Sequence, residues 1–192
     1  RVLADFTDTW SHGVDRYGDR RIGGFRVTAV AVEESGPLRA TLRIEAALGC
    51  SRLTLRARLV AGDRNLHLDL SLQWQERQKV AKLAFPLIHP VASRLDAVPG
   101  GSIKRPQDGR EVPYRDWTLA EGGPGIVAPD CWALDGEGRE IRFTLLRSPV
   151  FAWHDPRKLE ADQGYRYTDQ GEHHFRFVAV PAATPAALEA AA

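Results

Sequence analysis

The chain has 192 residues, and its 26 basic and 25 acidic side chains leave a formal net charge of +1. This length suits one large domain, or at most two small ones, and is enough to bury a substantial core. The balance of charge gives no electrostatic reason to expect a nucleic acid or an anionic membrane as a partner. No apolar run reaches the ~20 residues that a membrane helix needs. No charged segment followed by an apolar stretch indicates a signal peptide.

Two cysteines, Cys50 and Cys131, are too few for a disulfide framework. We therefore expect both thiols to be buried as small hydrophobic side chains, in a protein of the reducing bacterial cytoplasm. The sequence begins at Arg1 and contains no methionine, so we expect it to be part of a longer chain.

The first third of the chain alternates between apolar and polar residues. A short strand is expected near Val2, followed by an irregular, aromatic-rich segment. Alternation then covers residues 25–34, 38–48 and 53–59, with turn residues between these segments. Successive side chains of a strand point to opposite faces, so the pattern predicts three strands that each have one apolar face. Their regular spacing predicts an antiparallel meander.

Residues 64–89 carry the clearest pattern of all. Apolar residues occupy every second position from Leu66 to Trp74, and a second apolar row runs from Ala81 to Leu87. The polar residues 76–78 separate the two rows. This arrangement predicts an antiparallel hairpin, and its apolar face requires a second layer. The sequence therefore predicts an all-β antiparallel sandwich.

The pattern loosens between residues 90 and 129, where glycine and proline are frequent. Such long irregular segments are usually functional or disordered, although Tyr114 and Trp117 favour an ordered one. Strands are predicted again on both sides of residues 136–138 and over residues 172–180. Residues 182–192 are of low complexity, and we expect a frayed or weakly helical tail after a domain of residues 1–181.

No catalytic motif is apparent in the sequence. The six histidines lack the spacing of a zinc site, and His173 and His174 are expected to point to opposite faces of a strand. The sequence contains no nucleophile elbow or phosphate-binding loop, and its acidic residues do not single out the carboxylate pair of a glycosidase. We therefore expect neither a metal nor a cofactor in this chain.

Aromatic residues in irregular segments are the stronger signal. Sugars stack their C–H faces on aromatic rings, so such residues can form a sugar-binding surface. The alternative is that the rings cap the ends of the sandwich core. The residues concerned are Trp10, Tyr114, Trp117, Trp132, Trp153, Tyr165 and Tyr167.

Five segments in order resemble the C-terminal domain of glycoside hydrolase family 38, the α-mannosidases. They are residues 8–14 (DTWSHGV), 68–87 (LDLSLQWQERQKVAKLAFPL), 101–117 (GSIKRPQDGREVPYRDW), 143–149 (FTLLRSP) and 169–181 (DQGEHHFRFVAVP). The resemblance implies an all-β super-sandwich of the galactose mutarotase-like type. It also implies a parent enzyme that hydrolyses α-mannosides with retention. In that family the zinc, or a similar divalent metal, and the nucleophilic aspartate belong to an N-terminal barrel, which nothing in this chain matches. The family's last motif usually continues to a histidine, whereas Ala182 follows Pro181 here.

Within these motifs we single out polar and aromatic residues as candidates for substrate binding or for a domain interface. Arg105 could donate two hydrogen bonds to sugar hydroxyls or to a carboxylate. Asp169 precedes a turn that leads into the last strand, so a purely structural role is an alternative for it. The full set is Trp10, His12, Arg105, Trp117, Asp169 and His173.

Three hypotheses follow. The first is an accessory β domain of an α-mannosidase that packs on the N-terminal catalytic domain of the same polypeptide and helps to shape a cleft for mannose-containing glycans. It predicts an exposed apolar patch. The second is a stand-alone carbohydrate-binding module, which predicts that the loop aromatics line one groove. The third is an aldose mutarotase, which would need a histidine and a glutamate facing each other across a concave sheet.

Overall fold

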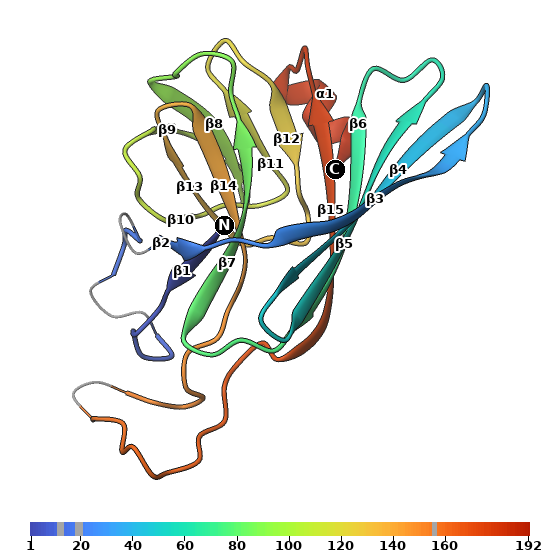
Figure 1. The fold of residues 1–192 in the computed structure, drawn as a ribbon. Coiled ribbons are helices and arrows are strands. Elements are labelled where there is room, and N and C mark those ends of the chain that lie inside the picture. Colours follow the sequence, from blue (N-terminus) through green and yellow to red (C-terminus); the bar gives the residue numbers. More distant parts are fainter. Residues whose placement is uncertain (11–13, 18–20, 155–156) are drawn as a thin grey trace.

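The computed structural model describes residues 1–10, 14–17, 21–154 and 157–192. Two antiparallel sheets lie face to face (Figure 1), which confirms the predicted all-β super-sandwich. The large sheet has the strand order β3 (Arg26–Ser35), β4 (Arg39–Leu48), β5 (Ser51–Val60), β6 (Leu66–Trp74), β15 (Gly171–Val180), β12 (Gly125–Val127), β11 (Trp117–Ala120), β8 (Ser93–Val98) and β9 (Gly101–Pro106). The small sheet has the order β10 (Val112–Pro113), β13 (Ala133–Glu137), β14 (Glu140–Arg147), β7 (Lys79–Pro86), β1 (Val2–Ala4) and β2 (Arg21–Gly23).

The predicted meander is present as β3 to β6, four consecutive strands that pair antiparallel. Leu70 on β6 lies opposite Leu55 on β5, and Leu55 lies opposite Ile44 on β4. Directly paired residues share a face of a sheet. The apolar rows of these strands therefore form one continuous face, and the polar rows form the other.

The predicted hairpin of residues 64–89 is wrong, because β6 and β7 belong to different sheets. β6 pairs with β5 and β15, whereas β7 pairs with β1 and β14. The intervening residues carry the chain across the sandwich. Gln78 adopts a left-handed conformation at φ 50°. Glu76 is buried, accepts a hydrogen bond from Ser51 and pairs with Lys79. The crossing lets the apolar rows of β6 and β7 face each other across the core.

Aromatic rings fill the centre between the sheets. Phe143 on β14 lies edge-on to Phe177 on β15, with ring centroids 5.5 Å apart, and Phe85 on β7 contacts both rings. Tyr114 packs on Phe143, and its hydroxyl donates a 2.7 Å hydrogen bond to the Ala128 carbonyl. Burial raises the pKa of Tyr114, so its phenol stays protonated and keeps this bond.

Residues 90–129 are an ordered part of the sandwich, with β8 to β12 in this segment. Trp117 is buried in a second apolar cluster, with Val127 and Val180. Asp96, which is fully buried, accepts hydrogen bonds from Arg94 and Thr118. The strands are short, so their alternation is too brief to stand out in the sequence.

The chain ends in a helix, α1 (Pro185–Ala191), which begins after Thr184 as its N-cap. The Thr184 hydroxyl accepts a hydrogen bond from the Ala187 amide, as is usual at this position. Leu188 is fully buried in the cluster around Trp117. The tail is therefore docked on the sandwich rather than frayed.

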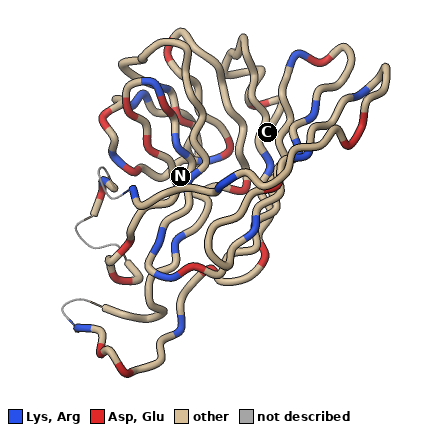
Figure 2. Tube along the Cα trace, in the orientation of Figure 1, with Lys and Arg blue, Asp and Glu red and all other residues tan. Residues whose placement is uncertain are grey.

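The two cysteines differ in environment. Cys131 is buried, as expected, and burial raises the pKa of its thiol. Cys50 is exposed in the β4–β5 turn, so the prediction of two buried thiols is wrong for this residue. Acidic and basic residues are interspersed along the chain (Figure 2). Within the described ranges, no helix is long and apolar enough to cross a membrane.

Candidate functional site

One apolar sheet face is only partly covered. On the apolar side of the large sheet, the side chains of β6 are mostly buried, those of β5 are mostly half-buried, and those of β3 are exposed. Figure 1 shows β3, β4 and β5 fanning out beyond the small sheet, which does not reach across them. We call this surface the open face. Its exposed members and their exposed fractions are Val27 (57%), Val30 (58%), Val32 (69%), Leu42 (37%) and Leu59 (55%). The face is the exposed apolar patch expected of a domain that packs on another domain.

A second candidate surface lies where the N-terminal segment meets the loop after β14. We call it the loop end, and it comprises residues 5–10, 147–154 and 168–173. Thr9 holds the two segments together, because its hydroxyl donates to the Val150 carbonyl at 2.8 Å and accepts from the Trp153 amide at 3.1 Å. The Thr9 amide in turn donates to the Trp153 carbonyl. The pairing fixes the position of exposed aromatic side chains at this end.

Arg147 is the central cation of the loop end. Its guanidinium donates to the buried carboxylate of Asp5 at 2.9 Å and to the Thr7 hydroxyl at 2.5 Å. Its backbone amide donates to the Asp169 carboxylate at 3.0 Å. Arg147 therefore connects the first segment of the chain to the turn before β15. Because charge-assisted hydrogen bonds are strong and directional, we expect the pair with the fully buried Asp5 carboxylate to hold the Arg147 side chain in one position.

Trp10 and His154 lie together on the exposed side of the loop end. Their ring centroids are 5.2 Å apart, with the planes nearly perpendicular. His154 Nδ1 lies 3.1 Å from Oδ2 of Asp8, whose side chain is buried, and the Trp10 amide donates to the other oxygen of that carboxylate. An exposed aromatic face beside a polar imidazole suits a sugar ring, which presents C–H groups and hydroxyls together.

A family model describes the relatives of this chain. The model for the glycosyl hydrolases family 38 C-terminal domain matches residues 8–157. The chain belongs to this family. The match contains both Asp8 and His154 and ends before β15.

Solved structures agree with the family match. An α-mannosidase from Enterococcus faecalis V583 superposes with a TM-score of 0.72 at 13% identity, covering 96% of this chain and 25% of that one. A family 38 protein from Enterococcus faecalis gives a TM-score of 0.71 at 13% identity, covering 96% and 26%. The chain thus spans about a quarter of the length of these structures. A galactose mutarotase related enzyme from Lactobacillus acidophilus gives a TM-score of 0.36 at 11% identity, covering 95% of this chain and 82% of that one. No curated protein matches the sequence.

The residues singled out from sequence as candidates for substrate binding or a domain interface do not lie together in this family 38 domain. Trp10, Asp169 and His173 lie at the loop end. Asp169 has a left-handed φ of 51°, and its carbonyl lies 3.0 Å from His173 Nε2, so it shapes the turn before β15. His12 lies outside the described residues.

Arg105 and Trp117 lie elsewhere in the family 38 domain. Arg105 does donate two hydrogen bonds, but to the buried Asp96 carboxylate at 3.3 Å and to the Pro113 carbonyl at 2.6 Å. Trp117 is 3% exposed in the core. The structure therefore gives both residues contacts that support the fold.

Sequence reasoning missed Asp5, Asp8, Arg147 and His154 as members of one site. Asp8 and Arg147 each fall inside a segment that resembles the family, and that is the signal that could have found them. The contact between Asp8 and His154 spans 146 positions, which no local pattern reveals.

The described part of the family 38 domain offers no group of three or more histidine, cysteine or acidic side chains that could hold a metal. The loop aromatics also do not line one groove, since Tyr114 and Trp117 are buried in the core. This arrangement counts against the stand-alone carbohydrate-binding module. His174 and Glu172 are one His–Glu pair that the structure does describe. Their side chains lie side by side on the solvent-facing side of β15, unlike a pair facing across a concave sheet.

Proposed function

We propose that this chain is the accessory β domain of a retaining α-mannosidase, and that it packs through the open face on an N-terminal catalytic domain of the same polypeptide. The open face is the observation that carries the proposal. Exposed apolar surface on a sheet is unfavourable in water at about 25 cal/mol per Å². A domain that keeps five large aliphatic side chains exposed on one face is suited to a partner surface. This chain corresponds to only about a quarter of each Enterococcus structure, so the rest of such a protein can supply that partner.

The loop end supplies the second part of the proposal. Trp10 and His154 form one wall of the cleft for mannose-containing glycans, with Asp8 and Arg147 holding them in place. The zinc or similar divalent metal, and the nucleophile of the two-step reaction, belong to the N-terminal domain in this proposal. The cytoplasmic location expected from two free cysteines is also part of it.

Lysine substitutions on β3 test the docking. Val30 and Val32 face the open side, whereas Ala29 and Ala31 on the same strand pair with Glu45 and Arg43 and face the opposite side. In the isolated chain, Val30→Lys/Val32→Lys and Ala29→Lys/Ala31→Lys should each change the free energy of unfolding by less than about 0.5 kcal/mol per site, because all four positions are exposed.

In the protein with its upstream region restored, the two pairs should differ. The valine variant should lower the melting temperature and α-mannosidase activity, because charges are then buried in an interface. The alanine variant should match the unsubstituted protein. Equal effects of both pairs, or of neither, would remove the open face as the docking surface.

A test of the loop end uses the same longer protein. Trp10→Ala should raise KM for an α-mannoside by about five-fold, since stacking on an indole contributes on the order of 1 kcal/mol. Phe151→Ala, which removes an exposed ring from the same loop, serves as the control. Unchanged kinetics in Trp10→Ala would show that this ring lies outside the cleft.

A further inference from the structure

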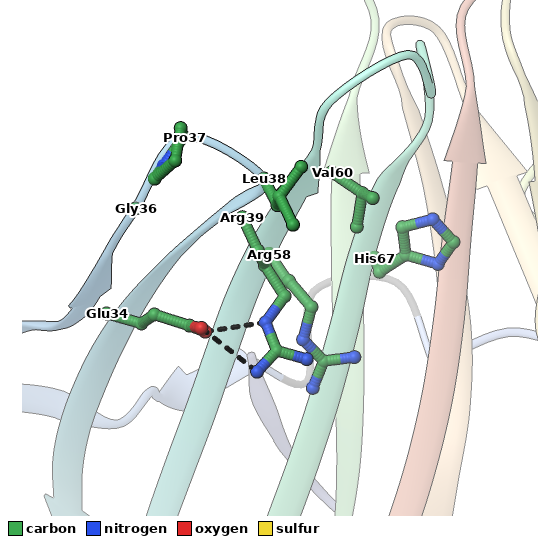
Figure 3. A pocket seen from close by; sticks show the side chains of 8 residues that line it. All are labelled: Glu34, Gly36, Pro37, Leu38, Arg39, Arg58, Val60 and His67. Carbon is green, nitrogen blue, oxygen red and sulfur yellow. Dashed lines mark hydrogen bonds and ion pairs between the residues drawn. The ribbon is translucent and has the colours of Figure 1, made fainter.

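A hollow opens at the far end of the long strands, beside the β3–β4 and β5–β6 turns (Figure 3). We call it the tip hollow. Arg39 pairs with Val60, and Arg58 pairs with both Thr41 and His67. These residues share the polar face of the large sheet, the side opposite the open face. The lining residues are Glu34, Gly36, Pro37, Leu38, Arg39, Arg58, Val60 and His67.

Charged side chains in and beside the tip hollow are held in pairs. Glu34 binds Arg39 through both carboxylate oxygens, at 2.6 and 3.1 Å, and also accepts from the Thr41 hydroxyl at 3.2 Å. Figure 3 shows the Arg58 guanidinium beside that of Arg39. Arg58 donates to Asp69 at 2.6 Å. A paired guanidinium keeps further N–H groups for a ligand, because it carries five donors in a fixed plane.

His67 and Asp63 form a third pair beside the tip hollow. His67 Nε2 lies 2.7 Å from the Asp63 carboxylate. The hydrogen bond from Arg39 lowers the pKa of Glu34, and the hydrogen bond with His67 lowers the pKa of Asp63. Both carboxylates therefore remain ionised acceptors at neutral pH. The hollow thus presents donors and acceptors side by side.

The pairing also restricts the class of ligand. Each guanidinium charge is already balanced by a carboxylate, so the hollow offers no net positive charge to attract a phosphate or a carboxylate ligand. A ligand with neutral hydroxyls does not depend on such a charge. Pro37, Leu38 and Val60 add an aliphatic surface, and Leu38 is 76% exposed. Apolar surface beside a few oriented polar groups is the usual composition of a small-molecule site.

We propose that the tip hollow binds a neutral carbohydrate on the outer face of the domain. Arg39 and Arg58 donate to neighbouring hydroxyls, and Glu34 accepts from another. Leu38 and Val60 pack against the C–H face of the ring. The inference is independent of the proposed function, because it uses the sheet face that the docking surface does not.

Amide chemical shifts of the isotope-labelled isolated chain test the site. The probe is methyl α-mannoside titrated to about 50 mM, since a shallow site for one sugar ring binds with a Kd on the order of 1 mM. Methyl α-glucoside and inorganic phosphate are titrated in parallel. Arg58→Gln is the site variant, and it leaves Asp69 at a partly exposed position where water can replace the lost bond. Arg43→Gln, on the same sheet face and paired with Glu45, is the matched control.

The expected result is saturable shifts at residues 34–39, 58–60 and 67 with a glycoside. Arg58→Gln should weaken them at least about ten-fold, which corresponds to one lost charge-assisted hydrogen bond, while Arg43→Gln should leave them unchanged. No saturable shifts, shifts only at the loop end, equal weakening by both variants, or phosphate binding in place of glycoside binding would each overturn the proposal. None of these outcomes bears on whether the open face docks.

Discussion

The contact between Leu188 and Gly125 determines whether the last residues of the chain belong to the folded domain. Leu188 is fully buried on a helix of seven residues, which is too short to be stable alone. Gly125 on β12 leaves room for it, because a Cβ built on Gly125 would lie 2.5 Å from Cδ2 of Leu188 and 2.7 Å from Cβ of Ala183. The packing of this side chain against the sheet therefore holds the helix in place.

The size of the effect follows from burial. Replacing a buried leucine by alanine lowers the free energy of unfolding by about 2–5 kcal/mol. We expect about 2–3 kcal/mol here, because a terminal helix can shift to fill the cavity or come away from the sheet without unfolding the rest of the domain. Gly125→Ala should cost about 1–3 kcal/mol by overpacking. The two changes should not be additive. Leu188→Ala removes both leucine atoms that the new methyl group would meet and leaves only the close contact with Cβ of Ala183. Gly125→Ala should therefore cost less in that background by about 1 kcal/mol.

Urea unfolding followed by tryptophan fluorescence and circular dichroism measures these free energies. For a chain of this size Leu188→Ala should also lower the melting temperature by about 5–10 °C. Glu189→Ala, at an exposed position of the same helix, is the control and should stay within about 0.5 kcal/mol of the unsubstituted chain. If Leu188→Ala matched that control, or if the two changes were simply additive, the docked helix would be refuted.

Three further predictions concern buried polar contacts, each measured by urea unfolding. Gly136→Ala should destabilise the chain by about 1–3 kcal/mol, because the new methyl group would lie 1.8 Å from the Gln107 side-chain oxygen and would displace that amide from its hydrogen bonds with Arg94 and the Glu140 carbonyl, and an unchanged midpoint would contradict this. Lys82→Met should cost about 3–5 kcal/mol at pH 7, because the buried ammonium pairs with two carboxylates that would lose their partner, and a neutral effect would exclude that pairing. Burial alone would raise the pKa of Glu76, but Lys79 and Ser51 lower it below the usual 4.5, so its contribution is present above that pH and lost as the pH falls further. The stability of Glu76→Gln should therefore differ from that of the unsubstituted chain above pH 4.5 and converge with it in acid, and a pH-independent difference would contradict the assignment.

The long strands were predictable from sequence because one of their faces is apolar over nine or ten residues. The sequence did not show which strands share a sheet. β7 finds its partners in β1 and β14, which lie far away in sequence, and the polar residues before it resemble a hairpin turn although Glu76 is buried. Residues 90–129 were not predicted as strands, since elements such as β12 with three residues are too short to show a period.

The last residues of the chain contain a helix-start signal, which is easy to overlook in a segment made mostly of alanine. Thr184 followed by Pro185 is a typical helix start, and Leu188 is the large apolar residue among alanines. At the loop end, Trp10 and Asp169 were predicted as candidates from family-like segments. Their connection through Arg147 depends on three separate segments meeting at one place, and only tertiary structure shows it.

The proposed accessory role is tested most directly by α-mannosidase activity. Hydrolysis of a chromogenic α-mannoside, with zinc or cobalt added, should be compared between this chain and the chain with its upstream region restored. Our account predicts hydrolysis by the longer protein and none by the isolated chain. Hydrolysis by the isolated chain would contradict it, and would place a catalytic pair among residues 1–192.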